Sequence, residues 1–475
     1  MSLINQLVMR RYAILLIAIL LPLHICAKRY VYPEYSLSQI QQIINESDHI
    51  IFRKGVYNVD DNTSWFVKSN KKLTFESGSR LDFTNTRAKQ YESLFNIQGD
   101  NVVFEGLCFT SSSRCSRSVY GNGPRDGFSS LCTVIMIRGN NVKVLNSNIK
   151  NAEIAVSISS GNDIVINNLH GECAQTIFAY NCHNLFITNI NSILTTNDVG
   201  DLDHHIYLKA DCRKVKISNS HFIGGPSYAI QISGDYSNPS ICPKGIKISN
   251  LVIEKSIRGV CVDLAHSDVT IYNVRASGVA SSRGESFFLA NRGGSVRILN
   301  SNFSDFNFIE LETIAIKTFK KGSSIFKNCS FCFESEYVSA FSLYYLDELV
   351  VNNCDFYYYK TSLYDGFIAR TNPDTQGVSM INIRNNSFYF NGISKSCFRF
   401  PTSLTKVYIN NNNFYSWDIV KGRLLSSDSN NQAYILNNCS SSIFTQVKDA
   451  EDYDFNTITL RQQEKKCKMF YKKVK

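Results

Sequence analysis

The sequence lacks three features that would indicate common functional classes. After residue 27, no stretch is apolar over the ~20 residues that a membrane span needs. The formal net charge is +10, but Arg10 and Arg11 carry two of these charges and residues 464–475, with six lysines and one glutamate, carry five. The body of the chain is therefore only slightly basic, which does not indicate nucleic-acid binding. One Cys-x-x-Cys stretch, from Cys329 to Cys332, has no second copy to complete a four-cysteine zinc site.

The N-terminus is the exception to the lack of apolar runs. An apolar stretch from Tyr12 to Leu23 follows two arginines and leads to the small residue Ala27. This order predicts a secretory signal peptide cleaved after Ala27, although a lipid anchor on Cys26 is an alternative. We therefore expect a mature chain without a transmembrane span that is secreted, periplasmic or held at the cell surface.

Cysteine is abundant, with 15 residues. Export permits disulfides, and Cys115–Cys132 and Cys212–Cys242 are candidate pairs. Three further cysteines recur just after the repeated asparagine described next, and we interpret them as small buried residues that stack between repeats: Cys329, Cys354 and Cys439.

The stretch from Val215 to Phe222 returns along most of the chain. Its pattern is apolar-x-apolar-x-Asn, followed by two small or polar residues and usually Phe or Ile. Successive asparagines of the pattern are 21 to 32 residues apart. Apolar alternation predicts strands, and a repeat of this length predicts a solenoid of single coils. The asparagines are Asn146, Asn168, Asn189, Asn219, Asn250, Asn273, Asn300, Asn328, Asn353, Asn385, Asn411 and Asn437.

Each coil has a second predicted strand before the asparagine motif, such as Ile206–Lys209. We expect the asparagines to stack at one corner as a ladder that satisfies buried polar groups. Ser36 to Gln39 form a capping box, which predicts a short amphipathic helix over the open end of the solenoid. The expected organisation is a signal peptide at 1–27, an N-terminal cap with helix and first strand at 28–60, a parallel β-helix at 61–448, and a C-terminal cap with a basic tail at 449–475.

These coils, the asparagine ladder and the capping helix resemble the right-handed parallel β-helix of the pectate-lyase-like superfamily. The resemblance covers residues 36–450 and implies an all-β fold: a single right-handed parallel β-helix solenoid with a short N-terminal capping α-helix. It does not determine activity, because the superfamily contains lyases, hydrolases, epimerases and non-enzymatic proteins. The Asn-Thr-Asp and Gly-His-Gly motifs of polygalacturonases and the Asp-Pro-His-Asp element of alginate epimerases are absent from this sequence.

The resemblance also implies a site on the outer face of one parallel sheet, beside long loops. Two long insertions, 111–131 and 193–204, adjoin the strands that precede the asparagine motif. Alternation along these strands predicts two outward columns of side chains. The first is Arg138, Ser159, Tyr180, Lys209, Ser233, Asp263 and Ala290, and the second is Met136, Ser157, Phe178, Tyr207, Gln231, Cys261 and Phe288.

On this face we first predict a β-eliminating polysaccharide lyase. Lys209, Tyr207 or His205, all expected to point outward from one strand, would be the base beside a uronate carboxylate. A cation would neutralise that carboxylate: Arg138, or a Ca²⁺ ion held by Asp198, Asp201 and Asp203. The residues expected to complete the site are Asp263 as a catalytic group and Tyr180, Phe178, Gln231 and His204 as contacts to the polysaccharide.

Two other functional classes remain open. A glycoside hydrolase needs two carboxylates across the scissile bond, for which Asp203 and Asp263 are the nearest candidates, with Asp235 behind them. A non-catalytic glycan-binding or surface protein would present aromatic rings without a base, and the tyrosine-rich late repeats (344–345 and 357–359) fit it. In each case the expected partner is an extracellular, acidic polysaccharide, and we expect a monomer.

Overall fold

The computed structural model of the chain describes residues 28–60, 62–84, 93–112, 133–194, 203–225, 227–235, 238, 240–263, 267–278, 287–306, 308–311, 322–334, 340–343, 347–360, 368–369, 379–390, 396–399, 406–416, 423–426, 432–440 and 458–462. The predicted signal peptide therefore lies outside the described residues, as do Asp198, Asp201, Cys115, Cys132 and the insertion 113–132.

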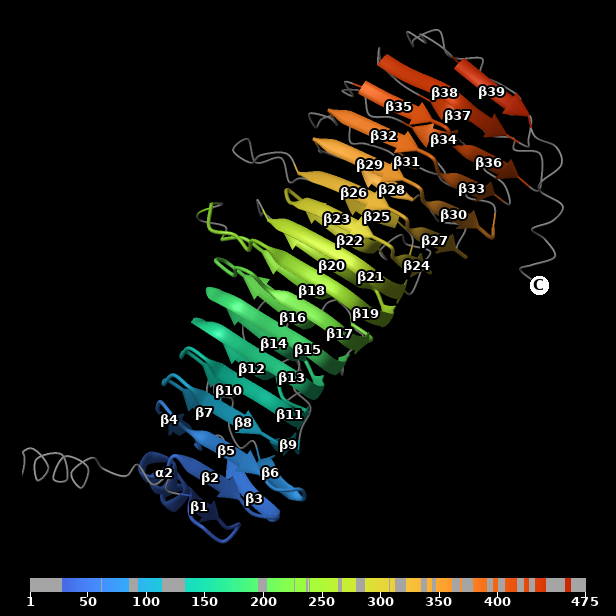
Figure 1. The fold of residues 1–475 in the computed structure, drawn as a ribbon. Coiled ribbons are helices and arrows are strands. Elements are labelled where there is room, and N and C mark those ends of the chain that lie inside the picture. Colours follow the sequence, from blue (N-terminus) through green and yellow to red (C-terminus); the bar gives the residue numbers. More distant parts are fainter. Residues whose placement is uncertain are drawn as a thin grey trace, which may run out of the picture.

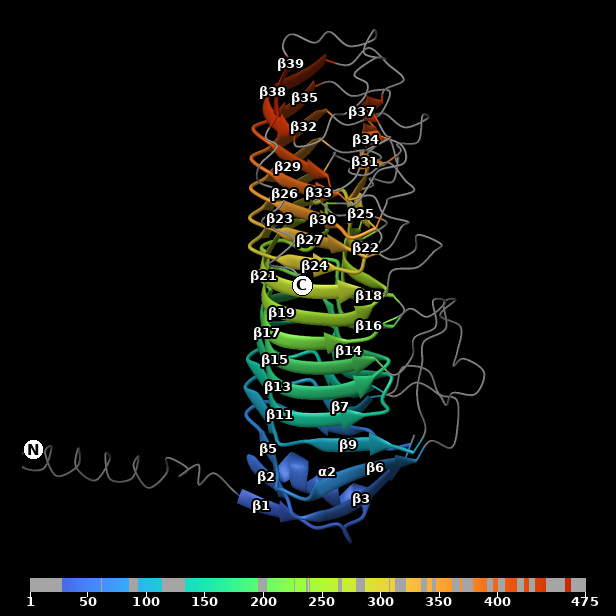
Figure 2. The same cartoon turned by 90° about the vertical axis from the view of Figure 1, so that its right-hand side faces the viewer.

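The chain forms a parallel β-helix whose coils stack along one axis (Figures 1 and 2). One strand per coil enters a 14-stranded sheet. Its members are β4 (Trp65–Val67), β7 (Ser93–Ile97), β10 (Thr133–Ile137), β12 (Ile154–Ile158), β14 (Gln175–Tyr180), β16 (His204–Lys209), β18 (Tyr228–Ser233), β20 (Arg258–Asp263), β22 (Phe287–Arg292), β25 (Phe308–Leu311), β28 (Phe341–Leu343), β31 (Ile368–Ala369), β34 (Ser396–Arg399) and β37 (Arg423–Ser426).

The rest of each coil enters a 25-stranded sheet, as one long strand or as two short ones. Its members are β1 (Lys28–Val31), β2 (His49–Phe52), β3 (Gly55–Asp60), β5 (Lys72–Phe75), β6 (Ser79–Thr84), β8 (Val102–Glu105), β9 (Cys108–Ser111), β11 (Val142–Lys150), β13 (Gly161–Cys173), β15 (Cys182–Leu194), β17 (Lys216–Ile223), β19 (Ile246–Ser256), β21 (Asp268–Gly278), β23 (Ser295–Leu299), β24 (Asn302–Ser304), β26 (Ser323–Lys327), β27 (Ser330–Phe333), β29 (Glu348–Asn352), β30 (Asp355–Tyr358), β32 (Met380–Arg384), β33 (Ser387–Phe390), β35 (Lys406–Asn410), β36 (Asn413–Ser416), β38 (Gln432–Ser440) and β39 (Ile458–Gln462).

A continuous apolar core runs through the coils, from Val31 to Ile409. Inward side chains stack on their equivalents one coil away: the rings of Phe331 and Phe356 are 4.7 Å apart, and those of Phe356 and Phe388 are 5.0 Å apart. Burying each such ring contributes about 2–3 kcal/mol. The continuity of this core confirms the predicted single solenoid.

The predicted capping helix is α2 (Leu37–Glu46), and its capping box forms as expected, with Gln39 N donating to Ser36 Oγ. Ile40 and Ile44 face the core. Gln41 accepts a hydrogen bond from Phe66 N (2.8 Å) and donates one to Phe66 O (3.0 Å). Because Phe66 lies in β4, the first strand of the 14-stranded sheet, this side chain satisfies backbone groups that an open sheet edge would expose. The described residues contain no helix that is long and apolar enough to cross a membrane.

The asparagine ladder is confirmed, with one correction. Asn250 donates to Asn219 (3.0 Å) and accepts from Asn273 (2.8 Å), and the same contact joins other successive coils. These asparagines, Asn146 to Asn411 of the pattern, all have φ between 50° and 57°, and their side chains are exposed rather than buried. Asparagine tolerates this left-handed conformation, which turns the chain at the corner and directs the amide outward.

The residue after the ladder asparagine is buried in the described coils. It is aliphatic in four of them (Leu169, Ile190, Leu251 and Val274) and polar or cysteine in the others: Ser147, Ser220, Ser301, Cys329, Cys354, Asn386 and Asn412. Cys329 and Cys354 are free thiols, as predicted for small stacking residues; the side chain of Cys439 is outside the described part. Cys212 and Cys242, a candidate pair, are also free thiols in this structure, as is Cys182.

A second ladder, not predicted, lies at the corner before the 25-stranded sheet. Asn101 donates to Asn70 (2.9 Å) and Asn141 donates to Asn101 (2.8 Å), and all three have φ between 50° and 60°. It continues with Asn184, which donates to Asp163. Asparagine at these turns therefore serves the same two purposes, a left-handed backbone and an amide contact along the axis.

Replacement of Asn250 separates these two purposes. Asn250→Ala is expected to lower the free energy of unfolding by about 1–2 kcal/mol, because it removes two amide contacts and places alanine at positive φ. Asn250→Gly removes the contacts only and is expected to cost less. Denaturant unfolding of both variants tests this, and an equal cost for alanine and glycine would show that the backbone conformation does not matter here.

Candidate functional site

The outer face of the 14-stranded sheet carries the candidate site, and strand register determines which side chains meet there. Between β14 and β20, the parallel pairing aligns three outward columns. They are, along the coils, Gln175, His204, Tyr228 and Arg258; then Phe178, Tyr207, Gln231 and Cys261; and then Tyr180, Lys209, Ser233 and Asp263. The second and third columns confirm the predicted alignment over these strands.

The predicted columns fail one coil later. Asp263 pairs with Arg292 and Cys261 pairs with Ala290, rather than with Ala290 and Phe288 respectively. Phe288 is instead buried, with its ring 4.0 Å from that of Phe303. The register between β20 and β22 therefore differs by two residues from the one that alternation predicted. Phe288 fills the core at the position that Gly259 occupies in β20.

His205 was expected to point outward, and the structure shows this to be wrong. Its ring is fully buried and stacks on Phe222 with 4.8 Å between ring centres. Nδ1 lies 2.6 Å from Ser192 Oγ, and Nε2 lies 3.0 Å from Gly224 O. Burial lowers the pKa of His205 to about 3, so the ring is neutral at physiological pH. A group enclosed in this way is a core residue and not a base for a polysaccharide.

An interruption of the alternation, which recurs at the same position of β10, β12, β14, β16 and β18, brings a third column to the outer face. His205 and Ile206 both face the interior, so the alternation along β16 is interrupted and His204 lies beside Tyr207. The His204 ring is 5.4 Å from the Tyr207 ring and 6.4 Å from the Tyr228 ring, and Nδ1 of His204 lies 2.9 Å from Tyr228 O. Because these contacts depend on the interruption, strict alternation along the strands did not predict that Tyr228 and Arg258 belong to the outer face.

Aromatic rings from three successive coils and an arginine from the fourth form a continuous cluster. Phe178 and Tyr207 meet edge to face at 5.5 Å, His204 connects Tyr207 to Tyr228, and the Arg258 guanidinium lies 5.5 Å from the centre of the Tyr228 ring. We call Phe178, His204, Tyr207, Tyr228 and Arg258 the aromatic cluster. His204 and Tyr228 are buried, whereas Phe178, Tyr207 and Arg258 are partly exposed, so the part open to a ligand combines two rings with a cation. This combination suits a ligand that has both apolar faces and negative charges.

The third column places charged and polar groups beside the aromatic cluster. Tyr180 and Lys209 are half-buried neighbours on adjacent coils, and Asp263 is two coils beyond Lys209. Asp263 is buried, with Oδ1 3.9 Å from Arg292 Nη1. Arg138 is exposed and lies three coils from Lys209 in the other direction, about 14 Å at ~4.8 Å per strand. Arg138 and Lys209 are therefore too far apart to act on one carboxylate.

The carboxylates do not form the predicted hydrolytic pair. Asp203 is buried just before β16, six residues from Lys209, whereas Asp263 aligns with Lys209 two coils away. Strand geometry separates the two by more than ~20 Å, beyond the ~9.5 Å of glycosidases. Asp235 is closer to Asp263 than Asp203 is, because Gly234 N donates to Asp263 O on the next coil (3.0 Å).

The predicted calcium site cannot be assembled from the described residues. Asp198 and Asp201 lie outside them, and Asp203 is fully buried. Across the described part of the chain, no group of three or more His, Cys, Asp or Glu side chains is arranged to hold a metal ion.

The tyrosine-rich late coils do not form a ring surface of the expected kind. Tyr358 is buried, and Tyr357, Tyr389 and Tyr415 stack face to face on successive coils, 4.8 and 4.9 Å apart. Their ring faces are covered by one another, so only edges remain for a ligand. Tyr359 is exposed, and Tyr344 and Tyr345 lie outside the described residues.

Comparison with known proteins identifies neither a matching family model nor a matching curated protein. Among solved structures, the chain is similar to a tailspike protein of E. coli bacteriophage HK620 in complex with a pentasaccharide (12% identity, 85% of this chain and 75% of that chain, TM-score 0.47). It is also similar to the Yersinia enterocolitica family 28 exopolygalacturonase (13%, 87% and 78%, 0.42) and to endopolygalacturonase I from Stereum purpureum complexed with galacturonate (13%, 74% and 98%, 0.44). By its own stacked parallel strands, the chain is an all-β, single-solenoid parallel β-helix protein with one short N-terminal helix.

Proposed function

We propose that this chain is an exported protein that binds an acidic polysaccharide across β14, β16, β18 and β20. The observation that supports this proposal best is the aromatic cluster on the outer face of these strands. Pyranose rings present apolar C–H faces that pack on aromatic rings, and Arg258 and Lys209 supply charges for uronate carboxylates. Strands ~4.8 Å apart let one extended ligand contact several coils in turn.

Binding ranks above catalysis because the described outward columns of these four strands contain a single carboxylate, Asp263. Glycoside hydrolysis is the second candidate. Asp263 and Asp235, which the Gly234 N–Asp263 O hydrogen bond places on neighbouring coils, are its candidate pair of carboxylates. The β-eliminating lyase becomes the third candidate, because His205 is enclosed in the core and Arg138 is distant, which leaves Tyr207 and Lys209 as possible bases.

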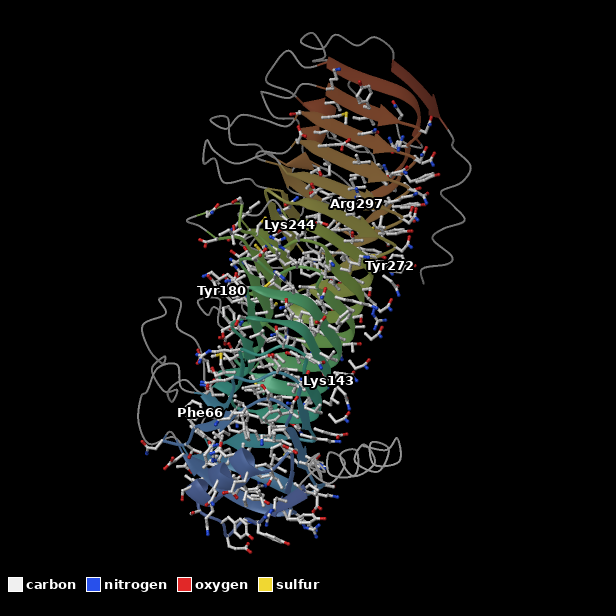
Figure 3. The ribbon with its side chains drawn as sticks, turned by 60° about the vertical axis from the view of Figure 1, so that its left-hand side comes forward. Phe66, Lys143, Tyr180, Lys244, Tyr272 and Arg297 are labelled. Atoms are coloured by element: carbon white, nitrogen blue, oxygen red, sulfur yellow. The ribbon has the colours of Figure 1, made fainter. Side chains whose placement is uncertain are left out.

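Truncation of Tyr207 tests the proposed surface. Tyr207→Ala is expected to weaken binding of a uronic-acid polysaccharide about tenfold, because it removes the ring at the centre of the cluster. Tyr272→Ala is the matched control: Tyr272 is 45% exposed on the other sheet, on the opposite side of the solenoid from Tyr180 (Figure 3). Isothermal titration with pectate or alginate, and with neutral dextran as a comparison, measures the effect.

The same preparations distinguish the three candidates. Binding without new reducing ends or an unsaturated product supports the non-catalytic binder. New reducing ends that are lost in Asp263→Asn support hydrolysis, and absorbance of an unsaturated product supports elimination. Tyr207→Phe keeps the ring, so it should preserve binding but abolish elimination if Tyr207 is the base; Lys209→Ala tests the other base. Equal affinity of Tyr207→Ala and Tyr272→Ala for every polysaccharide would place the ligand elsewhere.

A further inference from the structure

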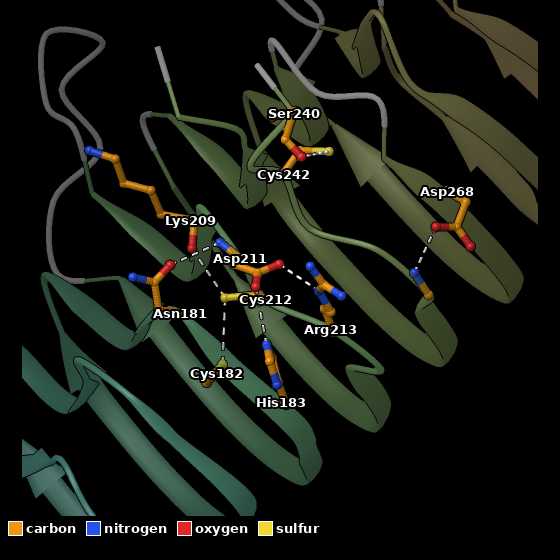
Figure 4. Close-up of polar contacts among 11 residues, drawn as sticks. Asn181, Cys182, His183, Lys209, Asp211, Cys212, Arg213, Ser240, Cys242 and Asp268 are labelled. Carbon is orange, nitrogen blue, oxygen red and sulfur yellow. Dashed lines mark hydrogen bonds and ion pairs between the residues drawn. The ribbon is translucent and has the colours of Figure 1, made fainter. Parts of the chain in front are cut away.

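Two buried cysteines, Cys182 and Cys212, meet on neighbouring coils (Figure 4). Cys182 begins β15, and Cys212 precedes β17. Their backbones run in parallel, with Arg213 N donating to Cys182 O (2.8 Å) and Asn184 N donating to Arg213 O (3.0 Å). The two Sγ atoms are 3.5 Å apart, and both side chains are fully buried.

This geometry meets the requirements of a disulfide bond. Paired strands are ~4.8 Å apart, and disulfides join Cα atoms separated by ~4.4–6.8 Å. The sulfurs already face each other, so a small side-chain rotation closes the contact to the bonded length of ~2.05 Å.

Other buried cysteines of the described part provide a comparison. Cys242, which sequence spacing paired with Cys212, has its sulfur 3.9 Å from Ser240 O. Cys329 and Cys354 also meet on neighbouring coils, with Cys329 N donating to Cys354 Sγ (3.4 Å). The direct contact between the sulfurs of Cys182 and Cys212, at 3.5 Å, is the observation that carries the inference.

We propose that Cys182 and Cys212 form a disulfide in the exported chain. The oxidant is a small disulfide such as oxidised glutathione, or an oxidoreductase disulfide. One cysteine thiolate attacks it and releases the first thiol; the second cysteine thiolate then displaces the second thiol from the mixed disulfide. The chain loses two electrons and two protons, and the oxidant becomes two thiols.

The bond has to form before the coils close. Both sulfurs are fully buried in the folded chain, so an external disulfide cannot reach either of them there. Once formed, the bond joins residues 30 positions apart. The segment between them contains β16, which carries His204, Tyr207 and Lys209, so the cross-link constrains the coil at the centre of the outer face.

Peptide mapping tests the inference independently of any activity. The full chain is refolded in a glutathione redox buffer, then unfolded in iodoacetamide and digested without reductant. We expect one cross-linked species that joins the Cys182 and Cys212 peptides and is lighter than the separate peptides by two hydrogen atoms. It should persist in Cys242→Ser and disappear on reduction.

The same map can overturn the inference. Recovery of Cys182 and Cys212 as alkylated thiols from oxidatively refolded protein would refute the bond, as would linkage of Cys212 to Cys242. The decisive measurement uses the unsubstituted chain, so it does not depend on whether a cysteine variant folds, and it stands even if the polysaccharide proposal fails.

Discussion

Asn386→Ala is expected to lower the free energy of unfolding by about 3 kcal/mol, because it leaves buried polar groups without partners. Asn386 is fully buried. Its Oδ1 accepts from Cys354 N (2.9 Å), and its Nδ2 donates to Val351 O (3.0 Å) and to Asn412 Oδ1 (2.9 Å). The amide thus joins three successive coils. Alanine fills only part of the space and leaves Cys354 N and Val351 O without the amide, whereas Asn412 Oδ1 keeps its bond from the backbone N–H of residue 386 (3.0 Å).

The neighbouring residue provides a matched control. Asn385 has the same side chain, is exposed, and makes one amide contact, to Asn352 Oδ1 at 3.1 Å. Asn385→Gly keeps the left-handed backbone available and is expected to cost at most about 1 kcal/mol. Denaturant unfolding monitored by circular dichroism compares the two variants. An equal loss of unfolding free energy in Asn385→Gly and Asn386→Ala would show that burial does not determine how much these amides stabilise the fold.

Acid is expected to destabilise the chain through His205. The pKa of this ring is about 3 in the folded chain and about 6.5 when unfolded. Between these values the unfolded chain binds a proton that the folded chain does not, so stability falls as the pH decreases from 6.5 towards 3. The loss due to this one group approaches about 1.4 kcal/mol per pH unit within that window.

His205→Gln tests the origin of this loss. Glutamine is neutral throughout, so the variant is expected to be less stable at pH 7 but to lose the His205 part of the slope between pH 6.5 and 3. His170→Gln is the control, because the His170 ring is only half-buried and lies beside Glu172 rather than inside the core. The measurement is the free energy of unfolding at several pH values. An unchanged slope in His205→Gln would show that other groups cause the acid sensitivity.

Much of the fold follows from local pattern. The apolar-x-apolar-x-Asn repeat predicts the strand, the turn and the stacking of coils, because each coil contacts mainly its neighbours and repeats one local solution. The capping box predicts α2 for the same reason, since its hydrogen bonds lie within four residues. The alignment of Phe178, Tyr207 and Gln231 also follows from the repeat, because equal strands in equal coils share one register.

Tertiary packing decided what alternation could not. Two successive residues are buried in β16, as they are at the same position of β10, β12, β14 and β18. In β16 the first of them is His205, whose ring packs on Phe222 and contacts Ser192 and Gly224. The same interruption brings His204 to Tyr207, and Tyr228 and Arg258 join them through the register of the next coils. Cys182 and Cys212 belong to different repeats and contact each other between coils. The alternation within one strand does not predict which residues of two coils meet.

By itself, the sequence determined the solenoid, its capping helix and the corner at which asparagines stack, since these depend on periodicity and on contacts repeated in every coil. Only the tertiary structure decided that the ladder asparagines are exposed, that His205 is buried, and which side chains meet on the outer face of the 14-stranded sheet. The physical reason is that a local change in strand alternation reverses the direction of a side chain without altering the average pattern of apolar residues.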